Sequence, residues 1–423
     1  MTTTSSESTP ESACGPFASA GFRRFFAART MADTGTEVGA LAMPLLAVLT
    51  LDATPGQVGL LGALTTAAYL IIGLPAGVWT DRFRRRPVIV VSQFLHGLIL
   101  LSIPLAWALG ALTLTQLYVC ALLGGAAALF SRIAQQGFLP ALVGRDRLLP
   151  ANAALTGLQS TSILVGRGSG GYLVQFLGAP AVLLLNGLAQ CASSLVTAAV
   201  RVQEPEPERS ERRLLAQIRE GARYVFGHEI LRPVAASTLI VNLGLSPLIV
   251  LAPVLIVTDL GLSEGRAGLF FMVGAVGVLL GSMVSTRLAV HLGTGRTLVL
   301  SSLVTGVGAL AVPFLTTANF WAVSVVWALS QLGIGTLNVV QVTLRQQVTP
   351  DRMIGRMTAT LRFLMTGALT IGALYAGAVA ELWDVRAALA VGAAVSLLGW
   401  IPLALSRLRG PDPQGGYGST RPG

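Results

Sequence analysis

Three charged residues, Arg29, Asp33 and Glu37, follow one another at intervals of four in an otherwise apolar part of the chain. Side chains four residues apart lie on one face of a helix, so the spacing predicts a single charged stripe. Carboxylates on such a stripe suit proton uptake and release, because a low-dielectric site favours their neutral form. The apolar stretch after Glu37 is too short to cross a bilayer alone. In a membrane-spanning chain, Asp33 and Glu37 would therefore lie within the membrane.

A fourth charge, Arg167, interrupts the apolar stretch GLQSTSILVGRGSGGYLVQF at residues 157–176. An arginine in the middle of a membrane span costs about 2.5–3.5 kcal/mol on insertion scales, so it needs an acid or a wet cavity. We predict that Glu37 is its partner. The alternative is an arginine that bonds only to backbone carbonyls. Asp33 has an alternative as well, which is a simple pair with Arg29 at the membrane edge.

The elements that hold these charges must be membrane helices. The 423 residues are 53% hydrophobic and 11% charged, with a mean hydropathy of +0.71, whereas a soluble domain is typically about 25% charged. All 29 basic residues are arginine, because the chain contains no lysine. This excludes a P-loop lysine and Schiff-base chemistry. The three scattered cysteines show no disulfide or metal-binding pattern, and we expect neither metal nor cofactor.

Twelve stretches have the roughly 20 mostly apolar residues that a spanning helix needs. They lie at residues 31–51, 57–79, 88–110, 113–133, 155–177 and 180–200, and at 234–257, 267–289, 296–315, 318–340, 357–380 and 387–406. We therefore predict an all-α membrane protein with twelve transmembrane helices in two six-helix bundles. The predicted parts are a disordered tail (1–22), a first bundle (23–200), a linker (201–232), a second bundle (233–409) and a second tail (410–423).

The linker and the loops predict how the chain sits in the membrane. Leu214, Ile218, Ala222 and Phe226 recur every four residues, which indicates an amphipathic helix on the membrane surface or on the bundle. Arginines gather in every second connection, and the intervening connections carry almost none. By the positive-inside rule, the linker and both termini are cytoplasmic. The pI of about 10.6 then reflects topology, and we expect no nucleic acid partner.

The two halves show traces of a repeat. Gly73 and Gly77 match Gly277 and Gly281 at a spacing of 204 residues, and the segments VGRDRLLPANA and VTPDRMIGRMT match at a spacing of 205. Both pairs occupy the same place in their halves, which indicates a parallel repeat about an axis along the membrane normal.

The loop GVWTDRFRRRP at residues 77–87 resembles the signature of the major facilitator superfamily. That signature is glycine, three residues, Asp-Arg, one residue, glycine and two basic residues. The chain matches it at Gly77, Asp81, Arg82, Arg85 and Arg86, and departs from it at Arg84, where the family has glycine. The segment FLPALVGRDRLLPANAAL at 138–155 is similar to the drug-exporter branch of the superfamily.

This resemblance implies two halves that rock around a central cavity. It implies that Asp81 caps the positive N-terminus of the eleventh span and so latches the outward-open state. Gly73 and Gly77 would let the second span approach its neighbour closely. The loop arginines, Arg82, Arg85 and Arg86, would position the loop through acids or lipid phosphates. The alternative is that they only fix the topology.

The resemblance also extends to the first and fifth spans. The first span lines the cavity in this fold, which makes Glu37, Asp33 and Arg167 candidate proton-coupling residues. In the fifth span, glycines match an antiporter signature whose proline is replaced by Arg167. The matching glycines are Gly166, Gly170 and Gly171.

Four amides, Asn242, Gln331, Asn338 and Gln341, are candidates for substrate contact in the cavity or for bonds between helices. Few polar anchors among many apolar residues favour a lipophilic substrate. We expect a monomeric secondary transporter of the plasma membrane that exports small lipophilic compounds, antibiotics or metabolites, in exchange for protons. We expect no enzymatic activity. The alternatives are an importer of a small nutrient and a non-transport membrane protein such as a lipid scramblase.

Overall fold

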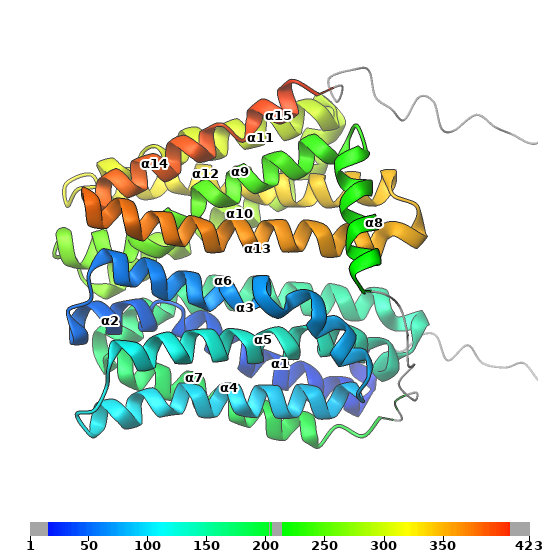
Figure 1. Ribbon diagram of the computed structural model, residues 1–423, viewed down its shortest axis with the longest axis horizontal. Coiled ribbons are helices and arrows are strands. Elements are labelled where there is room, and N and C mark those ends of the chain that lie inside the picture. The colour runs from blue at the N-terminus through cyan, green and yellow to red at the C-terminus, as the bar shows by residue number, and fades with distance from the viewer. Residues whose placement is uncertain (1–15, 203, 205–213, 407–423) are drawn as a thin grey trace, which may run out of the picture.

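The computed structural model describes residues 16–202, residue 204 and residues 214–406. Within these residues all regular secondary structure is helical. Figure 1 shows two stacked groups of helices with nearly parallel axes, α1–α7 in one group and α9–α15 in the other. We call the end of the molecule where α8 lies the linker end, and the opposite end, where α2 lies, the far end (Figure 1).

The first half contains six spans, the first of which is broken at residues 40–41 into two helices. Its helices are α1 (Ala20–Gly39), α2 (Ala42–Leu51), α3 (Pro55–Asp81), α4 (Arg85–Ala108), α5 (Leu114–Val143), α6 (Leu148–Leu177) and α7 (Ala179–Ala198). The second half contains α9 (Leu231–Val254) with a π-helical turn (Leu255–Asp259), α10 (Glu264–Leu292), α11 (Thr294–Ala309), α12 (Phe320–Val348), α13 (Asp351–Leu382), α14 (Val385–Leu397) and α15 (Trp400–Ala404). Three short 3₁₀ turns lie at Pro16–Ala18, Arg145–Arg147 and Val312–Phe314.

Eleven helical stretches of the described residues are long and apolar enough to cross a membrane. α6 is the twelfth span. Its polar side chains, including Gln159, Ser160 and Arg167, lower its hydropathy, yet its 30 residues reach about 45 Å at 1.5 Å per residue. It packs along α1 and α10 inside the bundle. The prediction of twelve transmembrane helices in two bundles of six is confirmed.

Several helices extend beyond their predicted limits. α1 begins at Ala20, after the Ser19 side chain, which accepts a hydrogen bond from Phe22 N over 3.4 Å. Phe22 is fully buried, meets the Phe17 ring edge to face and lies beside the tilted ring of Phe26. The predicted tail boundary at residue 22 was therefore wrong, because residues 16–22 belong to the folded structure. The arginines beside these phenylalanines make the segment look polar in sequence. The rest of that tail, and residues 407–423 of the other, lie outside the described residues.

The linker forms the predicted helix, α8 (Leu214–Gly227). It packs on the start of α13, where Gly221 lies against the Arg356 carbonyl and where Glu220 forms an ion pair with Arg356. The packed face contains Gly221 and the fully buried Val225, whereas Phe226 of the predicted apolar stripe is exposed. The side chains of Leu214 and Ile218 from the predicted stripe lie outside the described residues. In the described part of α8, the buried positions Gly221 and Val225 precede the predicted Ala222 and Phe226 by one residue, because a glycine permits the close contact with α13.

The two halves share one core at the far end and have separate cores at the linker end. The largest buried apolar cluster contains residues of both halves, such as Leu45, Leu61 and Leu248. At the linker end, one cluster belongs to the first half, including Phe138, and another to the second half, including Leu344. The apolar core shared by the two halves of the described residues therefore lies toward the far end.

Candidate functional site

Glu37 on α1 and Arg167 on α6 form the ion pair that their sequence positions predict. Arg167 Nε donates to Glu37 Oε2 over 2.8 Å. The side chains retain 34% and 18% of their accessible surface, so the pair lies inside the bundle but is not sealed. The Glu37 carboxylate is therefore partly accessible and directly paired with the guanidinium.

The glycines of α6 create the room for this pair. Gly166 lies against the Cβ of Glu37, and Gly170 lies against the backbone of Val38, so any side chain at either position would push α1 away. Gly171 makes the corresponding close contact with Gly268 on α10. The three glycines predicted from the antiporter signature are therefore brought to the two helices that flank α6.

Helix geometry then decides where Arg167 points. At about 100° per residue, it lies between the α6 face that contacts α1 and the face that contacts α10. The exposed apolar side chains of α6, including Val165 and Phe176, lie on the opposite side. Arg167 therefore faces the interior seam between the two halves and not the lipid.

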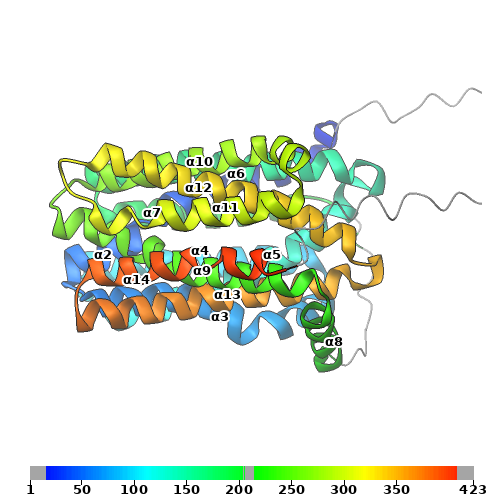
Figure 2. The same cartoon turned by 90° about the horizontal axis from the view of Figure 1, so that it is seen from above.

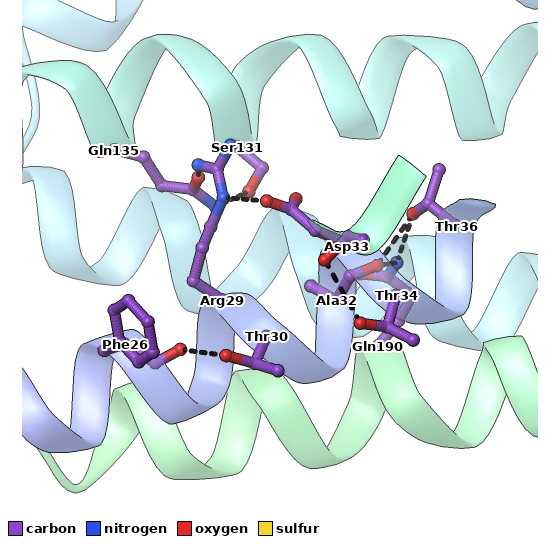
Figure 3. Close-up of polar contacts among 11 residues, drawn as sticks. Phe26, Arg29, Thr30, Ala32, Asp33, Thr34, Thr36, Ser131, Gln135 and Gln190 are labelled. Atoms are coloured by element: carbon purple, nitrogen blue, oxygen red, sulfur yellow. Dashed lines mark hydrogen bonds and ion pairs between the residues drawn. The ribbon is translucent and has the colours of Figure 1, made fainter. Parts of the chain in front are cut away.

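Arg29 and Asp33 form a second pair closer to the linker end. Arg29 Nε donates to Asp33 Oδ2 over 2.6 Å, and Arg29 Nη1 donates to Gln135 Oε1 on α5. Figure 3 shows Arg29 reaching from α1 toward Ser131 and Gln135, with Asp33 beside it. Gln135 in turn donates to Ser131 Oγ over 2.8 Å. The alternative in which Asp33 pairs with Arg29 is thus the observed arrangement.

Neutral groups fix the rotation of α1 about its axis. Gln190 on α7 donates to the Ala32 carbonyl over 3.1 Å and to Thr36 Oγ1 over 2.9 Å (Figure 3). On the other side, the hydroxyls of Thr34 and Ser162 lie 3.2 Å apart. These bonds hold the charged stripe of α1 toward the seam. As a polar residue within a predicted span, Gln190 is a candidate for bonds between helices, and it forms them here.

The predicted amides of the second half divide into two kinds. Asn242 donates to the Thr238 carbonyl over 2.8 Å, and Gln341 accepts from Thr238 Oγ1 over 3.0 Å, so both bond within or between helices. Asn338 is exposed, and Gln331 has a buried oxygen without a hydrogen-bond partner in the described residues. Asn338 and Gln331 remain candidates for substrate contact.

The tenth span was predicted to end at residue 340, which would place Arg345 in the connection that follows it. That placement was wrong. α12 continues to Val348, since the polar residues after 340 extend the helix. Arg345 Nη2 donates to Gln341 Oε1 and, over 3.3 Å, to Thr238 Oγ1 on α9.

The signature loop is tied to the first half by backbone groups. Arg85 donates to the Gly137 carbonyl on α5, and Arg86 donates to the Ala198 carbonyl at the end of α7. Glu204 accepts from both backbone N–H groups, at 2.5 Å from Arg85 N and 2.9 Å from Arg86 N, and so caps the start of α4. No sequence pattern distinguishes Glu204 from the other acids of the linker. Arg82 is exposed at the end of α3.

Gly73, Gly77 and Asp81 lie on the last turns of α3, and the side chain of Asp81 lies outside the described residues. A Cβ atom added at Gly73 would meet no heavy atom within 4 Å. The close approach predicted for Gly73 is therefore absent in this conformation.

Two helix pairs form the seam between the halves, α3 with α13 and α6 with α10 (Figures 1 and 2). At the far end they touch. Gly59 meets the backbone of Gly377, and Gly56 N donates to Glu381 Oε2 over 3.1 Å. Midway along the seam, the hydroxyls of Thr66 and Thr370 lie 2.8 Å apart.

At the linker end the same helix pairs separate. Gly157 lies on the face of α6 that meets α10 farther along, yet a Cβ atom there would touch nothing within 4 Å. Gly355 on α13 is equally free of neighbours. Together with Gly73, these positions show a seam that is closed at the far end and open at the linker end. Among the described residues, no cluster of His, Cys, Asp and Glu could hold a metal ion.

Residues 11–415 match the family described as transmembrane secretion effector. The chain belongs to the major facilitator superfamily. This confirms the resemblance drawn from the signature loop, and it makes the chain a multi-pass membrane protein.

Relatives within the superfamily include two named exporters. The chain is 26% identical to the multidrug efflux pump Tap of Mycolicibacterium fortuitum over 397 residues, which cover 92% of this chain and 96% of Tap. It is also 26% identical over 403 residues to the enterobactin exporter EntS of Escherichia coli, covering 93% and 94%. A bacterial homologue of the iron transporter ferroportin, in an inward-facing state, shares the fold with a TM-score of 0.68 at 20% identity, covering 91% of this chain and 98% of that one.

Proposed function

We propose that this superfamily member exports small lipophilic compounds from the cytoplasm by alternating access, driven by proton entry. The seam, open at one end and closed at the other, is the observation that carries the proposal. The linker end holds the arginine-rich loops, so the positive-inside rule assigns it to the cytoplasm. The described conformation is then inward-facing. Plasma membrane localisation, cytoplasmic termini and a monomeric state belong to the same proposal.

The Glu37–Arg167 pair is the coupling element of the proposed cycle. Arg167 is ion-paired with Glu37 in the inward-facing state. Both helices belong to the first half, so the cycle requires α1 to shift relative to α6 within that half as the halves rock. The carboxylate then loses its partner and takes up a proton from outside. Return to the inward-facing state restores the pair and expels the proton to the cytoplasm. The exporter names of the relatives Tap and EntS support the outward direction of substrate movement.

Cells that express the chain should accumulate less phenylnaphthylamine, an uncharged lipophilic dye, than control cells. An uncoupler should abolish the difference, because the proton gradient drives export. The measurement is dye fluorescence before and after the uncoupler is added. Cells expressing the Glu37→Gln variant at the same level are the matched control. Uncoupler-insensitive accumulation would contradict the proposal, and uptake of labelled nutrients would then point to import.

The helix register between α3 and α13 supports the latch role of Asp81. Successive contacts pair Gly59 with Gly377, Thr66 with Thr370, and Leu70 with Gly367. Continuing this antiparallel register places Asp81 opposite Gly355, within about a turn of the start of α13 at Asp351. Closing the linker end would bring the Asp81 carboxylate to the positive end of α13.

Asp81→Asn should slow transport without reducing the amount of protein in the membrane. A carboxylate at a partly buried helix N-terminus contributes about 1–2 kcal/mol, which is about five- to thirtyfold in the equilibrium between the two states. The measurement is the initial rate of dye efflux, with Arg82→Gln on the same loop as the control. A wild-type rate in Asp81→Asn would leave the loop with a purely topological role.

A further inference from the structure

Arg345 turns its charge away from the nearest membrane surface. Side chains of an α-helix tilt toward its N-terminus, and the N-terminus of α12 lies at the far end. The guanidinium bonds Gln341, one turn deeper in the membrane, and Thr238 on the neighbouring α9. An arginine that only anchored α12 would extend toward the cytoplasm.

No carboxylate neutralises Arg345. The two helices that supply its contacts, α9 and α12, contain neither aspartate nor glutamate. Within the described part of the chain Arg345 forms no ion pair, and its buried Nε donates to no acceptor. A cation without a counterion, partly buried between two helices, is costly, which makes Arg345 a candidate functional residue.

The repeat sharpens the contrast between the halves. Thr238 and Asn242 occupy the places of Asp33 and Glu37, at the spacing of 205 residues that relates the halves. In the first half, Arg29 pairs with Asp33 and Arg167 pairs with Glu37. In the second half a hydroxyl and an amide stand in place of the carboxylates, and Arg345, whose counterpart at this spacing is Pro140, lies beside them. Among the described residues, Arg345 is thus a positive charge without a paired carboxylate.

Two further side chains lie toward the same interior. Asn338 is exposed on the face of α12 that carries Arg345, opposite the lipid-side residue Leu329. On α13, Arg362 is exposed on the side away from the lipid-side residues Ile371 and Leu374. Arg362 also forms no ion pair among the described residues. Both side chains add donors for an anion.

We propose that Arg345, assisted by Asn338, binds an acidic group of the transported compound, so that lipophilic anions, which have an apolar body with a carboxylate, sulfonate or phosphate, are substrates alongside uncharged lipophilic compounds. The inference rests on the proposed efflux function and names its substrate class. A guanidinium presents paired N–H donors that suit such groups. Anionic phospholipid headgroups share this chemistry, and the test separates the two sources.

The test uses the full-length protein in phosphatidylcholine nanodiscs and two fluorescent probes. Anilinonaphthalene sulfonate is a lipophilic anion, and phenylnaphthylamine has the same skeleton without the sulfonate. Arg345→Gln should weaken sulfonate binding about tenfold or more, the loss of a charge-assisted hydrogen bond, and leave phenylnaphthylamine binding unchanged. Arg287→Gln, which removes an exposed arginine from the same half, should change neither affinity.

A second measurement needs no variant. Laurate should displace the sulfonate probe from the wild-type protein, and dodecyltrimethylammonium, of equal chain length, should not. Equal displacement by both, or equal loss of both probes in Arg345→Gln, would overturn the proposal. Phosphatidylglycerol in the nanodiscs should leave sulfonate binding by the wild type unchanged. A loss of sulfonate binding in its presence would identify a lipid headgroup as the ligand and overturn the proposal. Binding is measured without transport, so failure of efflux in cells leaves this result independent.

Discussion

Glu37→Gln should reduce substrate-driven proton movement to background while the purified protein still binds phenylnaphthylamine. Glutamine keeps the shape and can still accept a hydrogen bond from Arg167 Nε, but it cannot carry a proton. The Glu37–Arg167 contact of 2.8 Å is the sole ion pair that joins α1 to α6 in the described residues. The measurement is the pH change in inverted vesicles when substrate is added, across a range of pH.

The partner residue provides the control for this experiment. Arg167→Ala should keep coupling but change its pH dependence, because Glu37 loses the ion-pair partner that lies 2.8 Å away. Glu37→Gln alone should also lower stability by about 1–2 kcal/mol, less than for a fully buried pair because Arg167 is one-third accessible. The double variant should recover that loss. Wild-type coupling and pH profile in both single variants would make the pair structural.

Joining Thr66 and Thr370 through a disulfide should stop transport completely and reversibly. Their hydroxyls lie 2.8 Å apart across the seam, so cysteines at both positions fall within the distance that a disulfide requires. In a background without the three native cysteines, an oxidant should lock the far end closed, and a reductant should restore efflux. The measurement is dye efflux together with the mobility of the cross-linked chain.

The matched control lies on the same two helices at the linker end. The register that pairs Thr66 with Thr370 pairs Gly73 with Phe363. Cysteines at Gly73 and Phe363 should not cross-link in the described conformation, because nothing lies within 4 Å of a Cβ atom at Gly73. Conditions that populate the outward-open state should allow the bond. Full transport by the oxidised Thr66–Thr370 variant would contradict alternating access across this seam.

The sequence predicted those parts of the site where a buried charge would be too costly without a specific partner. Arg167 in mid-membrane needs an acid, and Glu37 was a nearby carboxylate at compatible depth, so their pairing followed from cost alone. The glycines of α6 likewise indicated close helix contacts before the partner helices were known. Span positions followed from hydropathy, because the bilayer fixes the length of an apolar helix.

Other features depended on tertiary contacts that composition does not encode. Arg345 looked like a loop residue, because the polar end of α12 resembles a connection in sequence. Its inward turn becomes visible only with Thr238 and Gln341 in place. Glu204 could not be distinguished from other linker acids until the start of α4 lay beside it. The open state of the seam also had no sequence signal, because a transporter sequence must be compatible with both states.

The wedge shape of this conformation couples the protein to the lipid around it. The halves meet at the far end and separate at the linker end, so the cross-section is larger in one leaflet than in the other. Reversing the wedge must expand the protein's footprint in the outer leaflet and shrink it in the inner one. The change of state therefore does work against the lateral pressure of the outer leaflet, and the lateral pressure of the inner leaflet assists it. We expect lipid asymmetry and membrane tension to shift the transport cycle even when substrate and proton concentrations are fixed.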